Sequence, residues 1–200
     1  LVLEAAGFRA PEPIYYSYIV LKDGKMSTRQ GKVVLLADFL DQAAALAAER
    51  VAEQCKELSE AEQRVIAEQV AVAAIRFAVL RVSPNKNVTF DMDAALSFTG
   101  DTGPYIQYSC ARIHSILRRH GAPVPDTVAA AFPVETNAEW ALLSRVAEFP
   151  GVVASAVAQR TCAPIAVYAL EIARLFTGFY HDCPVLNADT PEMVDARLQV

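Results

Sequence analysis

The 200-residue chain lacks the features of several common protein classes. Its four cysteines form no C-x-x-C pair, so neither a zinc site nor a disulfide framework is expected; they are Cys55, Cys110, Cys162 and Cys183. No apolar run is long enough to span a membrane. The net charge of −5 argues against broad, non-specific binding of nucleic acid. From the cysteine spacing we expect free, buried thiols in a reducing compartment. From the net charge we expect, at most, a local basic patch.

The patterns of nucleophilic and metal-dependent enzymes are also missing. Nothing resembles a Ser-His-Asp or Cys-His arrangement, and neither His114 nor His181 has a second ligand at metal spacing. Asp91 and Asp93 are two residues apart, but we expect this acidic turn to cap the helix near Ala94 rather than bind a metal. No metal site is predicted.

Apolar residues recur at helical spacing along most of the chain. The apolar fraction of 54% is enough to bury a sizeable core. Residues 13–21 are aromatic and β-branched on both faces and predict a buried strand. Residues 83–98 predict a connector with a short extended piece and one helical turn. Helices are predicted over residues 38–58 and 60–82, which form a hairpin, and over 105–120, 135–148, 150–160, 164–181 and 191–200.

The segment 99–119 is the most informative part of the chain. Thr102 is predicted to be the N-cap of its helix, and Pro104 suits the first helical turn. The face predicted to turn toward a core carries apolar residues at helical spacing: Ile106, Cys110, Ile113 and Leu117.

A neighbouring face of the same predicted helix collects aromatic and basic residues: Tyr105, Tyr108, Arg112, Ser115 and Arg119. Two rings and two guanidinium groups on one helix form a surface on which unpaired bases can stack, with positive charge for phosphates. Tyr180, at the end of a later helix, could present its ring in the same way. The alternative is that these tyrosines lie at the edge of a helical core.

Residues 25–32 form a polar loop with three cations and two hydroxyl groups after the predicted strand. Such a loop could close over a polyphosphate and stabilise the charge that develops at the α-phosphate. It lacks the Walker spacing and is therefore not a P-loop. The alternative is an ordinary solvated loop.

Four segments together resemble the class I arginyl-tRNA synthetases, in that family's order. Residues 25–31 (K-M-S-T-R-Q-G) resemble the KMSKS-type signature loop, and residues 90–112 resemble the entry into the helical anticodon-binding domain. Residues 149–150 and 168–186 resemble the next helices of that domain. Ala196-Arg197-Leu198 resembles the motif that names the DALR domain.

The resemblance implies a mainly α fold. It begins with the C-terminal edge of an α/β, Rossmann-like class I catalytic domain, followed by an all-α anticodon-binding bundle. The implied divisions are residues 1–40 for the tail of the catalytic domain, 41–98 for a helical hairpin and connector, and 99–200 for a DALR-type domain truncated at its C-terminus.

The family's reaction forms arginyl-adenylate from ATP and arginine, then transfers the arginyl group to tRNA(Arg). The resemblance implies ATP with Mg²⁺ as substrate, no membrane partner, a monomer and a cytoplasmic location. The residues implied to bind ATP are Lys25, Met26, Ser27, Thr28 and Arg29, with Lys25, Ser27 and Arg29 also catalytic. Those implied to face the anticodon loop are Tyr105, Tyr108, Arg112 and Tyr180.

Two departures from the family pattern limit what this chain is expected to do. Thr28 replaces the second lysine of the KMSKS pattern, and Arg29 could substitute for it only in part. The HIGH motif and arginine pocket are expected upstream of Leu1, so we expect no aminoacylation by this segment alone. The alternatives are a cysteinyl or other class I synthetase, or a non-catalytic helical tRNA-binding module.

Overall fold

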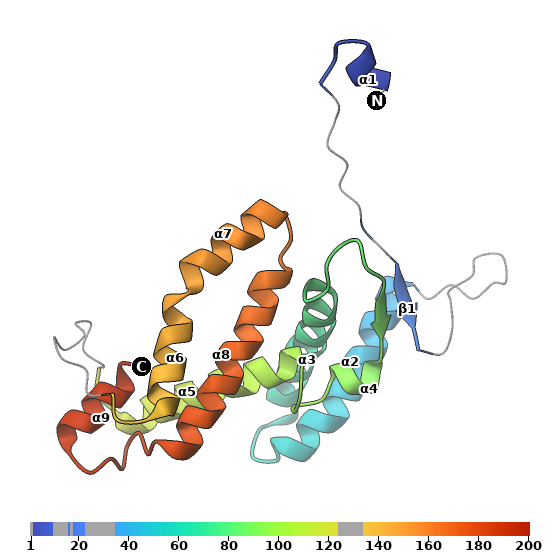
Figure 1. The fold of residues 1–200 in the computed structure, drawn as a ribbon. Coiled ribbons are helices and arrows are strands. Elements are labelled where there is room, and N and C mark those ends of the chain that lie inside the picture. Colours follow the sequence, from blue (N-terminus) through green and yellow to red (C-terminus); the bar gives the residue numbers. More distant parts are fainter. Residues whose placement is uncertain (1, 10–15, 17, 23–34, 124–133) are drawn as a thin grey trace.

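The computed structural model describes residues 2–9, 16, 18–22, 35–123 and 134–200, and helices dominate them (Figure 1). The mainly α fold predicted from the sequence is confirmed. The two strands in this part of the chain are β1 (Ile19–Leu21) and β2 (Val88–Phe90). The helices are α1 (Val2–Ala5), α2 (Leu36–Gln54), α3 (Glu60–Leu80), α4 (Met92–Ala95), α5 (Gly103–His120), α6 (Asn137–Ala147), α7 (Phe149–Gln159), α8 (Ala163–Asp182) and α9 (Pro191–Leu198).

The predicted helical hairpin is confirmed as α2 and α3, which pack along their lengths. Their interface is rich in alanine, whose small side chain lets the two backbones approach closely. Ser59 begins α3 with a capping box, because its hydroxyl accepts from the Glu62 N–H and the Glu62 carboxylate accepts from the Ser59 N–H. The buried residues of this first core are Ala43, Ala47, Val51, Ala67, Val70, Ala71, Ala74 and Leu96.

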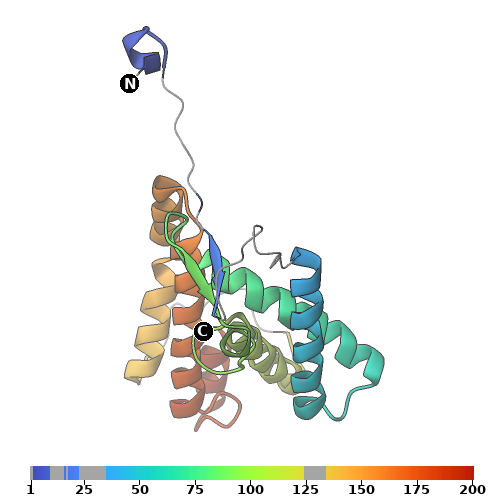
Figure 2. The same ribbon diagram turned by 90° about the vertical axis from the view of Figure 1, so that its right-hand side faces the viewer.

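A second core lies between α6 and α8, in the other half of the molecule. Leu142 of α6 packs here against Phe176 and Phe179 of α8. Ile116 of α5 and Leu198 of α9 pack against the same cluster. Figures 1 and 2 show α5 running between the α2–α3 hairpin and this second group of helices, so α5 joins the two cores.

The two strands form a parallel pair in which Val20 is opposite Thr89. Parallel strands need a long crossover, which α2 and α3 supply here. The connector predicted over residues 83–98 is confirmed as β2 followed by α4. The capping role of Asp91 is also confirmed, because its Oδ1 accepts from the Ala94 N–H at 3.1 Å.

The prediction of a buried strand over residues 13–21 is wrong in its described part. Only Ile19–Leu21 is a strand, and Tyr16 and Tyr18 are 90% and 81% exposed. In the part of the chain that the structure describes, β1 pairs with β2 alone.

The predicted start of α5 is confirmed. The Thr102 hydroxyl accepts from the Tyr105 N–H at 3.1 Å and donates to the Ser97 carbonyl at 2.6 Å. Pro104 lies in the first turn, and Gly121 ends the helix with a left-handed φ of 71°.

The predicted core face of α5 is wrong for Cys110, which is exposed, and for Ile113, which is 37% exposed, whereas Ile106 and Leu117 are half-buried. The helix packs between α3 and α8, so its buried side runs instead through Ser109 and Ile116. Ser109 can be buried because its hydroxyl donates to the Tyr105 carbonyl of its own helix at 3.1 Å.

All four cysteines are free, as expected. Cys183 is buried and Cys55 half-buried, but Cys110 and Cys162 are exposed, so the expectation of buried thiols is wrong for these two. Among the described residues, no single helix has the length and apolar character to cross a membrane. Only α6 and α7 taken together, with a 43° bend between them, reach that length and composition.

At Gly103 the backbone of α5 lies close against the backbone of α3. A Cβ atom at this position would lie 2.4 Å from the Ala73 carbonyl oxygen, which is backbone and cannot turn away. We therefore expect Gly103→Ala to lower the free energy of unfolding by about 1–3 kcal/mol in urea titrations.

Gly178, inside α8, is the matched control, because a Cβ atom there would meet nothing within 4 Å. Gly178→Ala is expected to raise the free energy of unfolding by about 0.5–1 kcal/mol, the usual gain in helix propensity. Equal effects of the two substitutions would contradict a close contact at Gly103.

Candidate nucleic-acid interface

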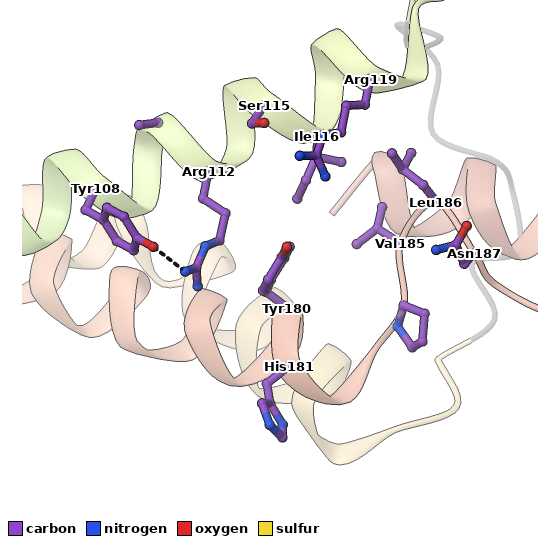
Figure 3. A pocket seen from close by; sticks show the side chains of 12 residues that line it. Tyr108, Arg112, Ser115, Ile116, Arg119, Tyr180, His181, Val185, Leu186 and Asn187 are labelled. Carbon is purple, nitrogen blue, oxygen red and sulfur yellow. Dashed lines mark hydrogen bonds between the residues drawn. The ribbon is translucent and has the colours of Figure 1, made fainter. Parts of the chain in front are cut away.

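A groove of about 620 Å³ lies between α5, the end of α8 and the segment that follows α8 (Figure 3). We call it the α5–α8 groove. One wall is the α5 face that carries Tyr108 and Arg112, and the end of α8 contributes Tyr180. The complete lining is Tyr108, Ala111, Arg112, Ser115, Ile116, Arg119, Tyr180, His181, Pro184, Val185, Leu186 and Asn187.

The guanidinium group of Arg112 lies against two tyrosine rings. Its central carbon is 4.7 Å from the centroid of Tyr108 and 4.6 Å from that of Tyr180. Arg112 also donates a hydrogen bond of 2.7 Å to the Tyr108 hydroxyl, drawn as the dashed line in Figure 3. Tyr108 and Arg112 meet because residues four apart lie on the same face of a helix.

Both tyrosines stay partly exposed despite these contacts, although the ring centroid of Tyr180 also lies 6.2 Å from that of Phe176. Tyr108 is 47% and Tyr180 39% exposed, whereas Arg112 is half-buried. The arrangement offers flat aromatic surface beside a fixed positive charge, which is the combination that binds unpaired bases and their phosphates. Three residues predicted from the sequence, Tyr108, Arg112 and Tyr180, therefore come together in one groove.

Tyr105 lies outside the lining of the α5–α8 groove. Its hydroxyl is 2.8 Å from the Thr177 hydroxyl, at hydrogen-bond distance, and donates a longer bond of 3.5 Å to the Ala173 carbonyl. The half-buried ring thus joins α5 to α8. Its predicted contact with an anticodon loop stays a prediction.

The predicted ATP-binding residues lie outside the described part of the chain: Lys25, Met26, Ser27, Thr28 and Arg29. Among the described residues, no group of three His, Cys, Asp or Glu side chains could hold a metal ion.

Asn187, Ile116 and His181 line the groove but are not predicted from the sequence. Ile116 lies four residues after Arg112, and that helical spacing was an available signal. Asn187 carried no local signal, because it reaches the groove only through the path of the chain after α8.

A buried ion pair supports the wall of the groove opposite α5. Arg197 Nε donates to Glu139 Oε1 at 2.7 Å, and the two side chains are only 9% and 0% exposed. Glu139 Oε2 also accepts from the N–H groups of Glu135 and Thr136, each at 2.8 Å, and from the Thr136 hydroxyl at 3.1 Å. The buried carboxylate therefore has hydrogen bonds on both oxygens.

Arg197 extends this pair to the groove itself. Its Nη1 donates to the carbonyl of Pro184, a lining residue, at 3.1 Å. One side chain thus ties α9 to the start of α6 and to the segment after α8. Arg197 belongs to the sequence motif that resembles DALR. In the structure its side chain holds parts of the fold together.

Comparison with protein families identifies two consecutive regions. Residues 12–92 match the description "tRNA synthetases class I (R), catalytic domain". Residues 106–200 match "DALR anticodon binding domain".

Curated relatives named arginine–tRNA ligase align with almost the whole chain. The protein of Methanospirillum hungatei is 38% identical over 187 residues, which cover 94% of this chain and 33% of the relative. Those of Methanopyrus kandleri and Streptomyces coelicolor are 41% and 42% identical, covering 94% and 92% of this chain and 31% of each relative. The chain thus spans about a third of the length of these relatives.

Two solved structures that superimpose on this chain are also arginyl-tRNA synthetases. The arginyl-tRNA synthetase of Thermus thermophilus superimposes with a TM-score of 0.80 at 32% identity, covering 92% of this chain and 30% of that one. The enzyme of Plasmodium falciparum gives 0.73 at 26% identity, covering 84% and 30%. The predicted arrangement, an edge of a catalytic domain followed by a helical bundle, is confirmed by this match.

Removal of the Arg197 side chain is expected to destabilise the fold strongly. Arg197→Ala leaves the buried Glu139 carboxylate without its cation, and such a loss costs about 3–5 kcal/mol. Arg64→Ala is the control, because Arg64 pairs with Glu68 on the surface at 3.5 Å and is 83% exposed. That variant should change the free energy of unfolding by less than about 0.5 kcal/mol. Similar losses in urea titrations of the two would contradict this role of Arg197.

Glu139 is expected to make stability dependent on acid pH. Burial alone would raise the pKa of Glu139, but hydrogen bonds from Arg197, Glu135 and Thr136 outweigh it and hold the pKa below its ordinary value. Ionised Glu139 therefore stabilises the fold fully above about pH 4.3, and this contribution is lost as the pH falls through the lower folded pKa.

The measurement is the free energy of unfolding of wild type and Glu139→Gln as a function of pH. The advantage of wild type should be constant at neutral pH and shrink across that acid window. An advantage that stays the same at all pH values would exclude ionised Glu139 as its source.

Proposed function

We propose, for a chain that belongs to the class I arginyl-tRNA synthetase family, that the α5–α8 groove binds the anticodon loop of an arginine tRNA. The whole protein would be an arginine–tRNA ligase, which uses ATP with Mg²⁺ to attach arginine to that tRNA. Because the chain spans about a third of its relatives, the complete reaction is proposed for the full-length protein.

The observation that carries the proposal is the position of Arg112 against the rings of Tyr108 and Tyr180. An unpaired base would stack on the exposed part of either ring, because every base has a flat π surface that an aromatic side chain can cover. The guanidinium group holds the two rings in place and adds positive charge for the phosphate of the same nucleotide. Tyr105, one turn earlier on α5, would complete the surface that faces the loop.

The signature-like loop would act at the other end of the chain. Lys25, Ser27 and Arg29 would close over the triphosphate of ATP, together with Met26 and Thr28. Their cations and hydroxyl groups suit a polyphosphate substrate, whose negative charge increases at the reacting phosphate. This assignment is supported by the sequence alone.

The remaining assignments follow from the same family. We propose a monomer in the cytoplasm, with no membrane partner. We also propose the divisions 1–40, 41–98 and 99–200 for catalytic tail, helical connector and anticodon-binding domain. The relatives named above are arginine enzymes, which favours arginine over the cysteinyl alternative.

The direct test is a titration of the chain with the stem-loop of an arginine tRNA anticodon. We expect binding to this loop and weaker binding to a matched loop in which the central C is replaced. A cysteine tRNA stem-loop tests the alternative substrate. Equal affinity for all three loops, in a chain shown by circular dichroism to be helical, would contradict anticodon recognition by this groove.

Loss of a stacking ring should weaken this binding. Tyr108→Ala and Tyr180→Ala are each expected to cost about 1–3 kcal/mol of binding free energy if the ring covers a base. Tyr18→Ala is the matched control, because Tyr18 is an exposed tyrosine beside β1 that does not line the groove. Unchanged affinity of both groove variants would exclude stacking.

The charge of Arg112 is tested separately, through the salt dependence of binding. If Arg112 contacts a phosphate, Arg112→Ala should reduce the slope of log K against log salt by about 0.7, the value for one single-strand contact. The titration is repeated at several salt concentrations for wild type and variant. Identical slopes would mean that Arg112 acts only by holding the rings.

A further inference from the structure

Three charged side chains meet where the α2–α3 hairpin, the start of α5 and α8 come together. Asp101 lies just before α5, Arg81 directly follows α3, and Arg174 lies on α8. The Arg174 guanidinium group donates a hydrogen bond to Asp101 Oδ1, and Arg81 Nη1 lies 3.8 Å from Asp101 Oδ2. The two oxygens of one carboxylate therefore face arginines from different groups of helices. We call these three residues the Asp101 bridge.

The backbone around Asp101 gives its carboxylate a defined position. Arg81 Nη1 donates a second bond, of 2.9 Å, to the main-chain carbonyl of Asp101. Gly100, just before, has a φ of 81°, which side chains other than glycine rarely permit. Thr102, just after, caps α5 with its hydroxyl. The carboxylate is therefore held at the start of α5 from both sides.

The bridge crosses the boundary between the two regions that match protein families. Arg81 lies in residues 12–92, which match the catalytic domain, and Arg174 lies in residues 106–200, which match the anticodon-binding domain. Asp101 belongs to the short stretch between them. One side chain thus connects the two regions directly, beside the crossing of α5 that Figures 1 and 2 show.

The place of the bridge at the start of α5 gives it leverage over the α5–α8 groove. A helix rises about 1.5 Å per residue, so Arg112 lies about 14 Å along α5 from Gly103, and a rotation of about 10° at that start moves it by about 2 Å. A misplacement of about 1 Å far from the reacting atoms is enough to lower a rate by about 10²-fold.

This leverage matters only for a ligand that contacts both regions at once. Two linked contacts reinforce each other when the geometry lets both form together, and the gain is lost when it does not. A complete tRNA would bind the groove with its anticodon and the catalytic region with its other end. An isolated anticodon stem-loop would contact the groove alone.

We infer that Asp101 is a positioning residue for the complete tRNA. Its bridge to Arg81 and Arg174 fixes the angle between the catalytic region and the helical bundle at which one tRNA reaches both. The inference rests on the proposed function, because that function supplies the second contact.

The test is steady-state aminoacylation of tRNA(Arg) by the full-length protein carrying Asp101→Asn or Arg174→Met. The bridge side chains are exposed, so loss of their charges has little effect on folding. We expect kcat/KM for tRNA to fall about 2- to 5-fold, the change in competent population that one exposed ion pair supports. The KM for ATP and the affinity for the anticodon stem-loop should not change, whereas general destabilisation would alter all three.

A double variant and a control on the same helix sharpen the test. Asp101→Asn combined with Arg174→Met should lose no more than either single variant, because both remove the same contact. Glu171→Gln is the control. Glu171 lies one turn before Arg174 and accepts from Arg145 of α6, so its ion pair stays within the bundle. This variant should keep the wild-type kcat/KM for tRNA.

The failure of this inference is distinguishable from that of the proposed function. Additive losses, an equal loss in Glu171→Gln, a parallel loss of stem-loop affinity, or wild-type kcat/KM in both bridge variants would each overturn the role of Asp101. The proposed function stands in all of these cases if the wild-type protein aminoacylates tRNA(Arg) and binds the stem-loop. If the wild-type protein does neither, both proposals fail.

Discussion

The contact between α5 and α3 at Gly103 determines the position of α5 and of the helices that pack against it. The Ala73 carbonyl leaves no room for a side chain there, so α5 begins directly on the α2–α3 hairpin. From that point α5 carries Tyr105 to α8, where its hydroxyl lies within hydrogen-bond distance of Thr177. Because α8 is held against α5 in this register, Tyr180 arrives opposite Arg112 at the end of α8. A helix crossing thus fixes two walls of the groove.

The third wall of the groove is the segment after α8, and its position depends on a buried charge pair rather than on apolar packing. Glu139 and Arg197 are 58 residues apart in sequence, and their pairing joins α6 to α9 while Arg197 also holds the Pro184 carbonyl. Apolar side chains of similar volume could stabilise the same contact equally well, since burying two charges has a high desolvation cost. Apolar side chains have no hydrogen-bond donor for the Pro184 carbonyl, whereas Arg197 does. The pair therefore gives the segment after α8 one defined position, which a groove for a flat ligand requires.

Local signals in the sequence were sufficient for the long helices and for part of the groove. The Thr102 cap, the end of the helix at residue 120 and the spacing from Tyr108 to Arg112 all act within one helix, so the sequence predicts them directly. The core face of α5 was predicted wrongly at Cys110 and Ile113 because periodicity finds apolar stripes, whereas α5 buries Ser109 between two neighbouring helices. Asn187 and the Glu139–Arg197 pair depend on contacts between distant segments, which no local pattern contains.

The distribution of charge also limits what the groove can bind. The chain carries a net charge of −5, which argues against strong attraction for long nucleic acids. Among the described residues, α5 offers a short attractive region. That region runs along the second half of α5, with Arg112 held between rings and Arg118 and Arg119 in the last turn. Cations at the C-terminus of a helix are stabilised by its dipole, so this charge costs the fold little. A surface with few phosphate contacts must gain its affinity from bases. Stacking on two rings, in a groove whose walls are fixed by Gly103 and Arg197, supplies that contribution.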